Sequence, residues 1–348
     1  MKFNKNISLG NYKISSGKPV FIIAEAGVNH NGSMERAKIL IDVAASSGAD
    51  AVKFQAFKTE NLILKNVEKA KYQIETTGDG ESQFEMLKKL EITRDQNIEL
   101  VNYCKKKNIL FLTTPFDEES LDELDALDLP AYKVASTDAT NLPFLKKIAQ
   151  KGKPVFLSTG MCYLSEVRLA LEQIHEFNQN IVLLQCSANY PIKDKDANLN
   201  VINTYKQEFD VLVGYSDHSV GIGAAPYAVP MGAVVIEKHF TIDKNMEGPD
   251  HRASLSPSEL KEFVHEIKRV ENFLGRYEKL PTKDELKTRK ALQKSLVALR
   301  NIQKGEFFTE YNIIAKRTGG KGISPIHYKQ LLGKKAKQEY SPNEIIHE

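Results

Sequence analysis

Two stretches of the chain decide its fold: VLVGYSDHS at residues 211–219 and AVVIEKHFT at residues 233–241. Each starts as a short apolar run of strand-forming residues and continues into polar side chains that include one histidine, His218 or His239. The small residues at 221–232 leave room between the two runs for a crossover helix. Because neighbouring parallel strands lie about 5 Å apart, side chains from the two strand ends can reach one metal ion.

The same alternation of apolar runs and amphipathic helical stretches extends over most of the chain. Continuously apolar strands are typical of a parallel sheet that is covered by helices. Eight such units predict a (β/α)8 TIM barrel rather than an open doubly wound sheet, since the first strand–helix turn lacks a dinucleotide-binding fingerprint. The predicted strands are residues 20–24, 51–57, 109–114, 131–136, 154–159, 181–186, 211–215 and 233–237, and the predicted helices include 34–47, 94–107, 118–127, 142–151, 165–177 and 257–274.

The character of the sequence changes after residue 275. We therefore predict a barrel at residues 1–275, a charged linker at 276–288 that contains Pro281, and a small domain at 289–348. The small domain has short strand-like pieces at 295–299 and 313–315. A domain of about 60 residues buries little surface and is marginally stable alone, so we expect it to pack against its own barrel or a partner's.

Composition excludes several classes of protein. The 348 residues are 41% hydrophobic and 27% charged, and the net charge of +3 is too small to indicate nucleic acid or an anionic membrane as a partner. Cys104, Cys162 and Cys186 lack the spacing of metal ligands or disulfide pairs, which indicates free thiols in a reducing compartment. No apolar run reaches membrane-spanning length, and the first residues lack the apolar centre of a signal peptide. We expect a cytoplasmic protein.

Nearly every predicted strand delivers a polar side chain to the barrel face where TIM-barrel enzymes carry their chemistry. Lys53 and Lys133 stand inside apolar strands, and a buried lysine without an anionic partner is costly. With four nearby hydroxyls they suit a phosphate or carboxylate ligand. Read in chain order, the strand ends carry Glu25, Lys53, Gln55, Thr114, Lys133, Ser136, Ser158, Tyr190, Ser216, Asp217, His218, Glu237 and His239, with Lys238 and Asp250 adding charge near the histidine pair.

Two other interpretations of the lysines stay open. They could form internal ion pairs with Glu25 and Glu237, or one of them could be a Schiff-base nucleophile as in barrel aldolases. The histidine pair argues against the need for an imine, because a divalent ion can itself polarise a carbonyl group.

At these residues the chain resembles the sialic acid synthases, which condense phosphoenolpyruvate with an N-acetylated sugar. The resemblance runs in order over almost the whole chain, and residues 295–348 resemble the antifreeze-like (SAF, β-clip) domain of these enzymes. Two departures are Asp138, where the family has glutamate, and Thr318, where proline commonly follows Arg317; we expect the first to shorten an acidic side chain and the second to loosen a capping loop. The matching motifs are IAEAGVNHNG at 23–32, VKFQ at 52–55, TTPF at 113–116, YK at 132–133, LSTGM at 157–161, SDHS at 216–219, EKHFT at 237–241 and GPDH at 248–251.

The resemblance implies a metal-dependent condensation that yields a nine-carbon 2-keto sugar acid and phosphate. It implies Mn²⁺, Mg²⁺ or Co²⁺ on His218 and His239, and a homodimer in which each small domain covers the partner's barrel mouth. Glu25 is the best placed general base. We assign catalysis to Glu25, Lys53, Lys133, His218 and His239, phosphoenolpyruvate binding to Lys53, Thr114, Lys133, Ser136, Ser158 and Ser216, and sugar binding to Gln55, Tyr190, Glu237, Asp250 and, on a glycine-rich loop of the partner, Arg317.

The acceptor sugar is ranked from the resemblance alone. N-acetylmannosamine, the acceptor of an N-acetylneuraminate synthase, comes first. The diacetamido trideoxymannose of an N,N'-diacetyllegionaminate synthase follows closely. A pseudaminic acid synthase is disfavoured by GPDH at residues 248–251, and a Schiff-base aldolase or a binding protein comes last.

Overall fold

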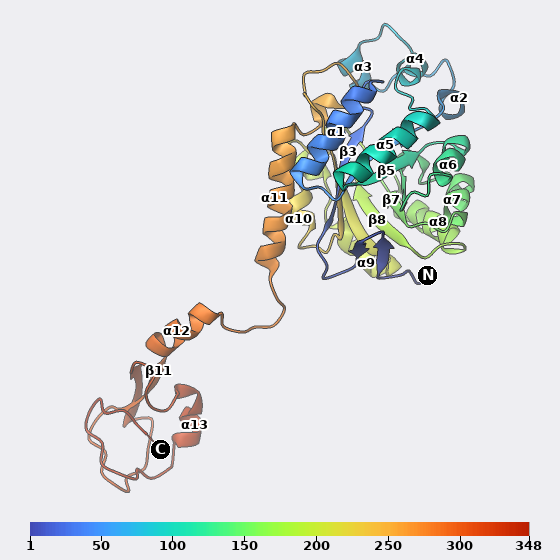
Figure 1. The fold of residues 1–348 in the computed structure, drawn as a ribbon. Coiled ribbons are helices and arrows are strands. Elements are labelled where there is room, and N and C mark those ends of the chain that lie inside the picture. Colours follow the sequence, from blue (N-terminus) through green and yellow to red (C-terminus); the bar gives the residue numbers. More distant parts are fainter. Residues whose placement is uncertain (348) are drawn as a thin grey trace. The chain divides into compact units, whose positions relative to one another are not determined.

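The computed structural model describes residues 1–347 and divides the chain into two compact units, Met1–Gly275 and Arg276–Glu348 (Figure 1). Each unit has its own apolar core. None of the helices in the described part of the chain is long and apolar enough to cross a membrane.

The first unit is a nearly closed barrel of eight parallel strands, which confirms the predicted TIM-barrel fold. The strands are hydrogen-bonded in the order β5-β4-β3-β10-β9-β8-β7-β6. The end strands β5 and β6 lie next to each other, so the sheet curls back on itself. The strand bounds are β3 Phe21–Gly27, β4 Ala51–Ala56, β5 Leu110–Pro115, β6 Tyr132–Val134, β7 Val155–Ser158, β8 Ile181–Cys186, β9 Leu212–Asp217 and β10 Val235–His239.

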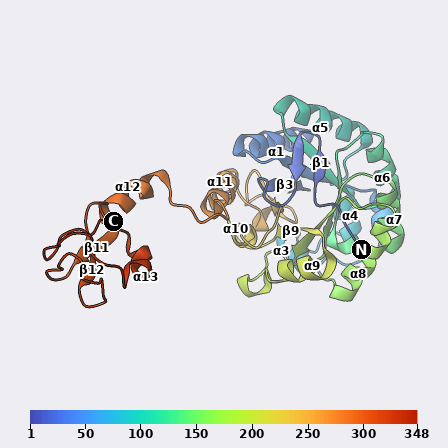
Figure 2. The ribbon, with the colours of Figure 1, turned by 90° about the horizontal axis from the view of Figure 1, so that it is seen from below.

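Helices surround the strands, as Figure 2 shows. Their starts follow from capping residues: the side chains of Ser33 and Thr93 accept hydrogen bonds from backbone N–H groups of the first helical turns of α1 and α5. Their apolar faces pack on the outside of the sheet and make the largest core of the barrel unit. The helices are α1 Met34–Ser47, α5 Arg94–Lys107, α6 Glu118–Asp125, α7 Leu142–Gln150, α8 Leu164–His175, α9 Val201–Phe209, α10 Ala225–Ala228 and α11 Pro257–Leu274.

A short hairpin that the sequence analysis missed packs at the N-terminal end of the barrel. Strands β1 (Ile7–Leu9) and β2 (Tyr12–Ile14) pair antiparallel. Their buried aliphatic side chains join one apolar cluster with residues near the N-terminal ends of the barrel strands, such as Phe21, Phe156 and Leu212. This end of the barrel interior is therefore apolar, which leaves the opposite, C-terminal end for polar groups.

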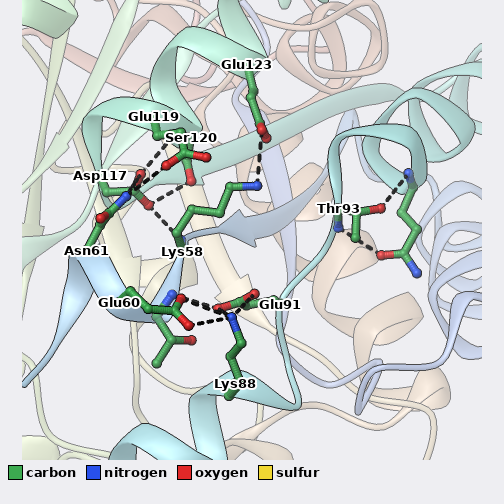
Figure 3. A network of polar contacts seen from close by, with 12 residues as sticks. Lys58, Glu60, Asn61, Lys88, Glu91, Thr93, Asp117, Glu119, Ser120 and Glu123 are labelled. Carbon is green, nitrogen blue, oxygen red and sulfur yellow. Dashed lines mark hydrogen bonds and ion pairs between the residues drawn. The ribbon is translucent and has the colours of Figure 1, made fainter. Parts of the chain in front are cut away.

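A long excursion between β4 and α5 lies at the C-terminal end of the strands. It carries α2 (Thr59–Leu62), α3 (Lys71–Thr77) and α4 (Gln83–Lys88). Figure 3 shows the polar network that holds its two ends. The backbone N–H of Lys58 donates to Asp117 Oδ2 at 2.8 Å, just beyond β5, and that of Thr59 donates to Glu91 Oε1 at 2.7 Å. Lys88 bridges Glu60 and Glu91. The excursion is thus anchored beside the face where the strands end.

The predicted crossover helix at 221–232 is wrong in extent, because only Ala225–Ala228 is helical. Gly221 and Gly223 have φ of +62° and +61°, which a right-handed helix cannot contain. Strands β9 and β10 also run further than predicted, so that Asp217 and His239 are their last residues.

The second unit contains α12 (Lys283–Leu292), an antiparallel pair of strands β11 (Lys294–Ala298) and β12 (Ile313–Arg317), and α13 (Tyr328–Leu331). Its core includes Leu296, Phe308 and Tyr340. The segment predicted as a linker, 276–288, includes the first six residues of α12. The expectation that Arg317 lies on a glycine-rich loop is wrong, because it ends β12 and pairs with Lys294. Strand pairing ends at Arg317, and Thr318 separates it from Gly319 and Gly320.

Candidate active site

Four charged side chains meet inside the barrel near the C-terminal ends of the strands. Lys53 Nζ lies 2.7 Å from Glu25 Oε2 and 3.8 Å from Glu237 Oε2. Lys133 Nζ lies 3.6 Å from Glu237 Oε1. Strand register explains the first contact, since Glu25 on β3 lies directly opposite Lys53 on β4. These four residues, here called the charge cluster, have side chains that are at most 4% exposed. Both lysines therefore form the internal ion pairs that the sequence left open.

The two glutamates of the charge cluster have pKa values shifted in opposite directions. Burial raises the pKa of Glu25 to about 7, against the opposing effect of Lys53. Burial acts on Glu237 as well, but Lys133 and Lys53 outweigh it and lower its pKa to about 2. Burial also lowers the pKa of Lys133. Glu25 can therefore exchange a proton near neutral pH, whereas Glu237 remains a carboxylate that neutralises lysine charge.

Two of the predicted hydroxyl groups are hydrogen-bonded to the charge cluster. Thr114 Oγ1 on β5 accepts a hydrogen bond from Lys53 Nζ at 2.9 Å. Ser216 Oγ on β9 donates to Glu237 Oε1 at 2.8 Å, because the two residues are directly opposite on adjacent strands. These hydroxyls hold the cluster in place and lie where a ligand of the lysines would bind.

Two further hydroxyls come from β7 and the turn after β6. Ser136 Oγ accepts a hydrogen bond from the backbone N–H of Gly160 at 2.8 Å. Ser158 Oγ is buried and has no hydrogen-bond partner within residues 1–347. An unpaired buried hydroxyl is costly, and an oxygen-rich ligand would relieve that cost. Ser158 is thus the hydroxyl of the set best suited to a bound anion.

The two histidines lie side by side at the ends of β9 and β10, with ring centroids 5.4 Å apart. His218 Nδ1 lies 2.9 Å from the carbonyl oxygen of Ser187. With Nδ1 as the donor, Nε2 of His218 keeps a lone pair for a ligand. His239 Nδ1 is buried without a hydrogen bond in the described chain, and Asp250 Oδ2 lies 3.9 Å from it.

The pKa values of the two imidazoles are shifted in opposite directions. Burial, with His218 adding to it, lowers the pKa of His239 well below the usual value, which leaves the neutral ring that binds metals. Burial also opposes charge on His218, but negative charge on the Cys186 sulfur, 3.7 Å from Nδ1, outweighs it and raises the pKa of His218. The charged ring carries a proton on Nε2 as well as on Nδ1, so a metal ion that binds Nε2 would have to displace the Nε2 proton.

The residues present fit a metal ion that takes only some of its ligands from the protein. In the described chain no three or more His, Cys, Asp or Glu side chains are grouped as a metal site. Two imidazoles 5.4 Å apart by centroid, one with a buried nitrogen that lacks a hydrogen bond, fit a divalent ion whose other ligands are water or substrate oxygens.

Three of the five predicted sugar ligands surround the histidines and Glu25. The Tyr190 ring centroid lies 4.2 Å from that of His218 and 5.6 Å from that of His239. Gln55 Nε2 donates weakly to Glu25 Oε1 at 3.4 Å. Asp250 is near His239, and burial raises the pKa of Asp250 to about 6. Glu237 is part of the charge cluster, and Arg317 belongs to the second compact unit.

Asp217 and Lys238 were predicted only as polar residues at the strand ends near the histidine pair, with no partner assigned to either. In the structure they form a buried ion pair of 2.9 Å directly behind the two histidines. The available signal was one charged residue immediately before each histidine, at matching positions of two successive strands. It could have indicated a cross-strand pair.

Comparison with known proteins gives a consistent picture. Residues 40–279 match the NeuB family and residues 293–348 match the SAF domain. The N,N'-diacetyllegionaminic acid synthase of Campylobacter jejuni is 48% identical, over 95% of this chain and 100% of that protein. The human N-acetylneuraminate-9-phosphate synthase is 37% identical, over 91% of this chain and 88% of that protein. A solved N-acetylneuraminic acid synthetase from Leptospira borgpetersenii, in complex with citrate, has a TM-score of 0.72 and 36% identity, over 84% of this chain and 98% of that one.

Proposed function

The chain belongs to the NeuB family of sialic acid and related synthases, and on that premise we propose that it condenses phosphoenolpyruvate with an acylamino sugar at the barrel face described above. The product is a nine-carbon 2-keto sugar acid, and inorganic phosphate is released. The observation that carries the proposal is the charge cluster, which lies beside two adjacent histidines at the ends of the strands. Lysines for an anion, a carboxyl group poised near pH 7 and a cation site are the parts this reaction needs.

We further propose that Mn²⁺, Mg²⁺ or Co²⁺ binds His218 and His239. When bound, such an ion supplies a Lewis acid for the aldehyde oxygen of the open-chain sugar. Removal of the metal by chelation should abolish phosphate release, and Mn²⁺ should restore it. His218→Ala should lose activity without recovery at high Mn²⁺, whereas full activity after exhaustive chelation would contradict the metal role.

The chain's own residues account for the remaining steps. Lys53 and Lys133 hold the phosphoenolpyruvate anion, with Ser158 as a hydrogen-bond donor. Carbon 3 of phosphoenolpyruvate bonds to the aldehyde carbon, and the electron pair of the aldehyde C=O bond goes to its oxygen, which takes up a proton and becomes a hydroxyl group. Water then adds at carbon 2. Glu25 takes the proton of that water, which its pKa of about 7 permits. The bond between carbon 2 and the phosphate oxygen then breaks, and phosphate leaves with the electron pair. The carbon 2 hydroxyl group gives its proton to the departing phosphate and becomes the keto group.

For the acceptor, we propose the 2,4-diacetamido-2,4,6-trideoxymannose used to make legionaminic acid. The sequence analysis had placed N-acetylmannosamine first. Support for the change is the difference in identity, 48% to a diacetyllegionaminic acid synthase against 37% to an N-acetylneuraminate-9-phosphate synthase. N-acetylmannosamine remains the second candidate, because a solved N-acetylneuraminic acid synthetase is 36% identical.

We also propose a homodimer in which each SAF domain covers the partner's barrel mouth. The support is the match of residues 293–348 to the SAF domain and the family resemblance that implies this arrangement.

The deciding experiment measures phosphate release from phosphoenolpyruvate with each candidate sugar in turn. The proposal expects release with the diacetamido sugar at a higher kcat/KM than with N-acetylmannosamine, and none without a sugar. Borohydride treatment in the presence of substrate gives the competing outcome. A covalent adduct at Lys133, whose pKa is lowered by burial, would favour a Schiff-base aldolase instead.

A further inference from the structure

A second polar pair lies on the opposite face of the two strands that carry the histidines. Asp217 and Lys238 are directly opposite each other on β9 and β10, one residue along from the Ser216–Glu237 pair. Because successive strand residues point to opposite faces, Asp217 and Lys238 face away from the charge cluster. Lys238 Nζ lies 2.9 Å from Asp217 Oδ2, and the two side chains are 1% and 0% exposed.

The same pair holds the turn that contains His218. Asp217 Oδ1 accepts hydrogen bonds from the backbone N–H of Ser219 at 2.9 Å and from its hydroxyl at 2.5 Å, which closes the chain around the histidine. Lys238 Nζ donates to the carbonyl oxygen of Ser219 at 2.7 Å. Lys238 therefore contacts both neighbours of His218 and is itself the neighbour of His239.

Gly223 packs tightly against this arrangement. A Cβ atom at Gly223 would lie 1.9 Å from Ser219 Oγ and 3.0 Å from Asp217 Oδ2, and its φ of +61° disfavours any side chain. A side chain at Gly223 would therefore overlap the Ser219 hydroxyl and force it to move.

We infer that the Asp217–Lys238 ion pair is a positioning clamp that fixes the separation of His218 and His239, and through it the affinity of the metal site. The inference rests on the proposed function, since it takes the two histidines as metal ligands. A buried ion pair contributes little net stability compared with apolar residues of the same volume. The pair does, however, join the ends of β9 and β10, and it does so at the residues that immediately precede the two histidines. Groups that orient metal ligands typically change metal affinity by about 10- to 100-fold.

The test is the double variant Asp217→Asn/Lys238→Met. It removes both charges at nearly constant volume, leaves no unpaired buried charge, and keeps an oxygen that can accept from Ser219. Besides the tether between the strands it removes the hydrogen bond from Lys238 to the Ser219 carbonyl oxygen and the Asp217 Oδ2 acceptor of the Ala225 N–H, so all the contacts of the clamp except those of Oδ1 are lost together. We expect the Mn²⁺ dissociation constant, followed by electron paramagnetic resonance of free Mn²⁺, to rise about 10- to 100-fold. The Mn²⁺ concentration for half-maximal activity should rise equally, while the KM for phosphoenolpyruvate at saturating Mn²⁺ stays within about twofold. Lys151→Met, which breaks an ion pair with Asp122 on the α6–α7 side, is the matched control and should leave Mn²⁺ affinity unchanged.

The outcomes separate this inference from the proposed function. If the wild type binds Mn²⁺ through His218 and the double variant binds it equally well, the clamp is wrong and the metal site stands. If His218→Ala does not weaken Mn²⁺ binding, the metal proposal fails, and imidazole NMR of the metal-free protein decides the clamp. The clamp then predicts that neutral His218 of the wild type is a single tautomer with its proton on Nδ1, and that the double variant shows a mixture of tautomers. Identical His218 imidazole signals in the two proteins would overturn the clamp. Should the double variant fail to fold, Gly223→Ala displaces Ser219 without removing a charge, and unchanged Mn²⁺ affinity there also overturns the clamp.

Discussion

Lys53→Met separates the structural role of the charge cluster from its chemical role. Lys53 Nζ is 2.7 Å from Glu25 Oε2, and both side chains are at most 3% exposed. At an effective dielectric constant of about 20, charges at this distance attract by about 6 kcal/mol. Desolvation offsets much of that attraction, and breaking a buried pair by removing one partner costs about 3–5 kcal/mol in practice. Glu25 would keep only the 3.4 Å contact with Gln55, whereas Glu237 would retain Lys133 and Ser216.

At pH 9, where Glu25 with its pKa of about 7 is ionised in the wild type, we therefore expect Lys53→Met to lower the free energy of unfolding by about 3–5 kcal/mol. Lys53→Met/Glu25→Gln should recover most of this loss, because no unpaired charge then remains buried. Urea unfolding followed by far-UV circular dichroism measures both, since the chain has no tryptophan. Lys151→Met, in a partly exposed pair, should cost about 1 kcal/mol or less.

Phosphate release then decides between the two roles. If Lys53 and Glu25 bind substrate and move a proton, the double variant is stable and inactive. Recovery of activity together with stability in the double variant would refute the chemical role, and would show that the Lys–Glu pairs only support the barrel. A single variant as stable as the wild type would refute the electrostatic reasoning itself.

The other predictions concern the second lysine, the small domain and pH. Lys133→Arg keeps the charge but changes its shape, so we expect a raised KM for phosphoenolpyruvate with residual activity; a KM equal to wild type would count against direct contact. Mixing inactive Glu25→Ala with inactive Arg317→Ala after subunit exchange should restore part of the activity if each barrel takes Arg317 from its partner, and none if it does not. Burial lowers the pKa of His30 to about 4. Between about pH 6.5 and pH 4 the His30 ring is therefore protonated in the unfolded chain but neutral in the folded one. Stability should fall as pH falls through that window, by roughly 3 kcal/mol for this ring, and His30→Gln should flatten the melting temperature against pH; an unchanged slope would exclude the ring as the cause.

The barrel was predictable because its signal is local. Runs such as residues 181–184 are apolar at every position, which a strand covered on both faces requires, and helix starts such as Ser33 and Thr93 carry their own caps. The hairpin Ile7–Ile14 escaped prediction because each of its strands has three residues. Its burial comes from the barrel end on which it packs.

The sequence was enough to predict which residues form the site, but not which of their side chains pair with one another. Strand ends of a barrel meet by topology, so Glu25, Lys53 and Glu237 could be placed on one face from their positions alone. Which carboxylate pairs with which lysine depends on strand register and side-chain reach, and the sequence left it open. Residues 221–232 were misjudged because small residues suit a helix by size, whereas Gly221 and Gly223 adopt left-handed backbone conformations there.

Strands β9 and β10 carry two cross-strand polar pairs on opposite faces, and each depends on the same register. Ser216–Glu237 faces the charge cluster, and Asp217–Lys238 faces the helices one position further on. A slip of one strand by one residue would place an outward-facing side chain opposite an inward-facing one, and would break both pairs at once. The buried Asp217–Lys238 pair resists that slip, because either charge alone would be left buried without a partner. The ion pair behind the histidines therefore also helps to hold Glu237 between Lys53 and Lys133, so the geometry of the anion site and that of the cation site are set by one register.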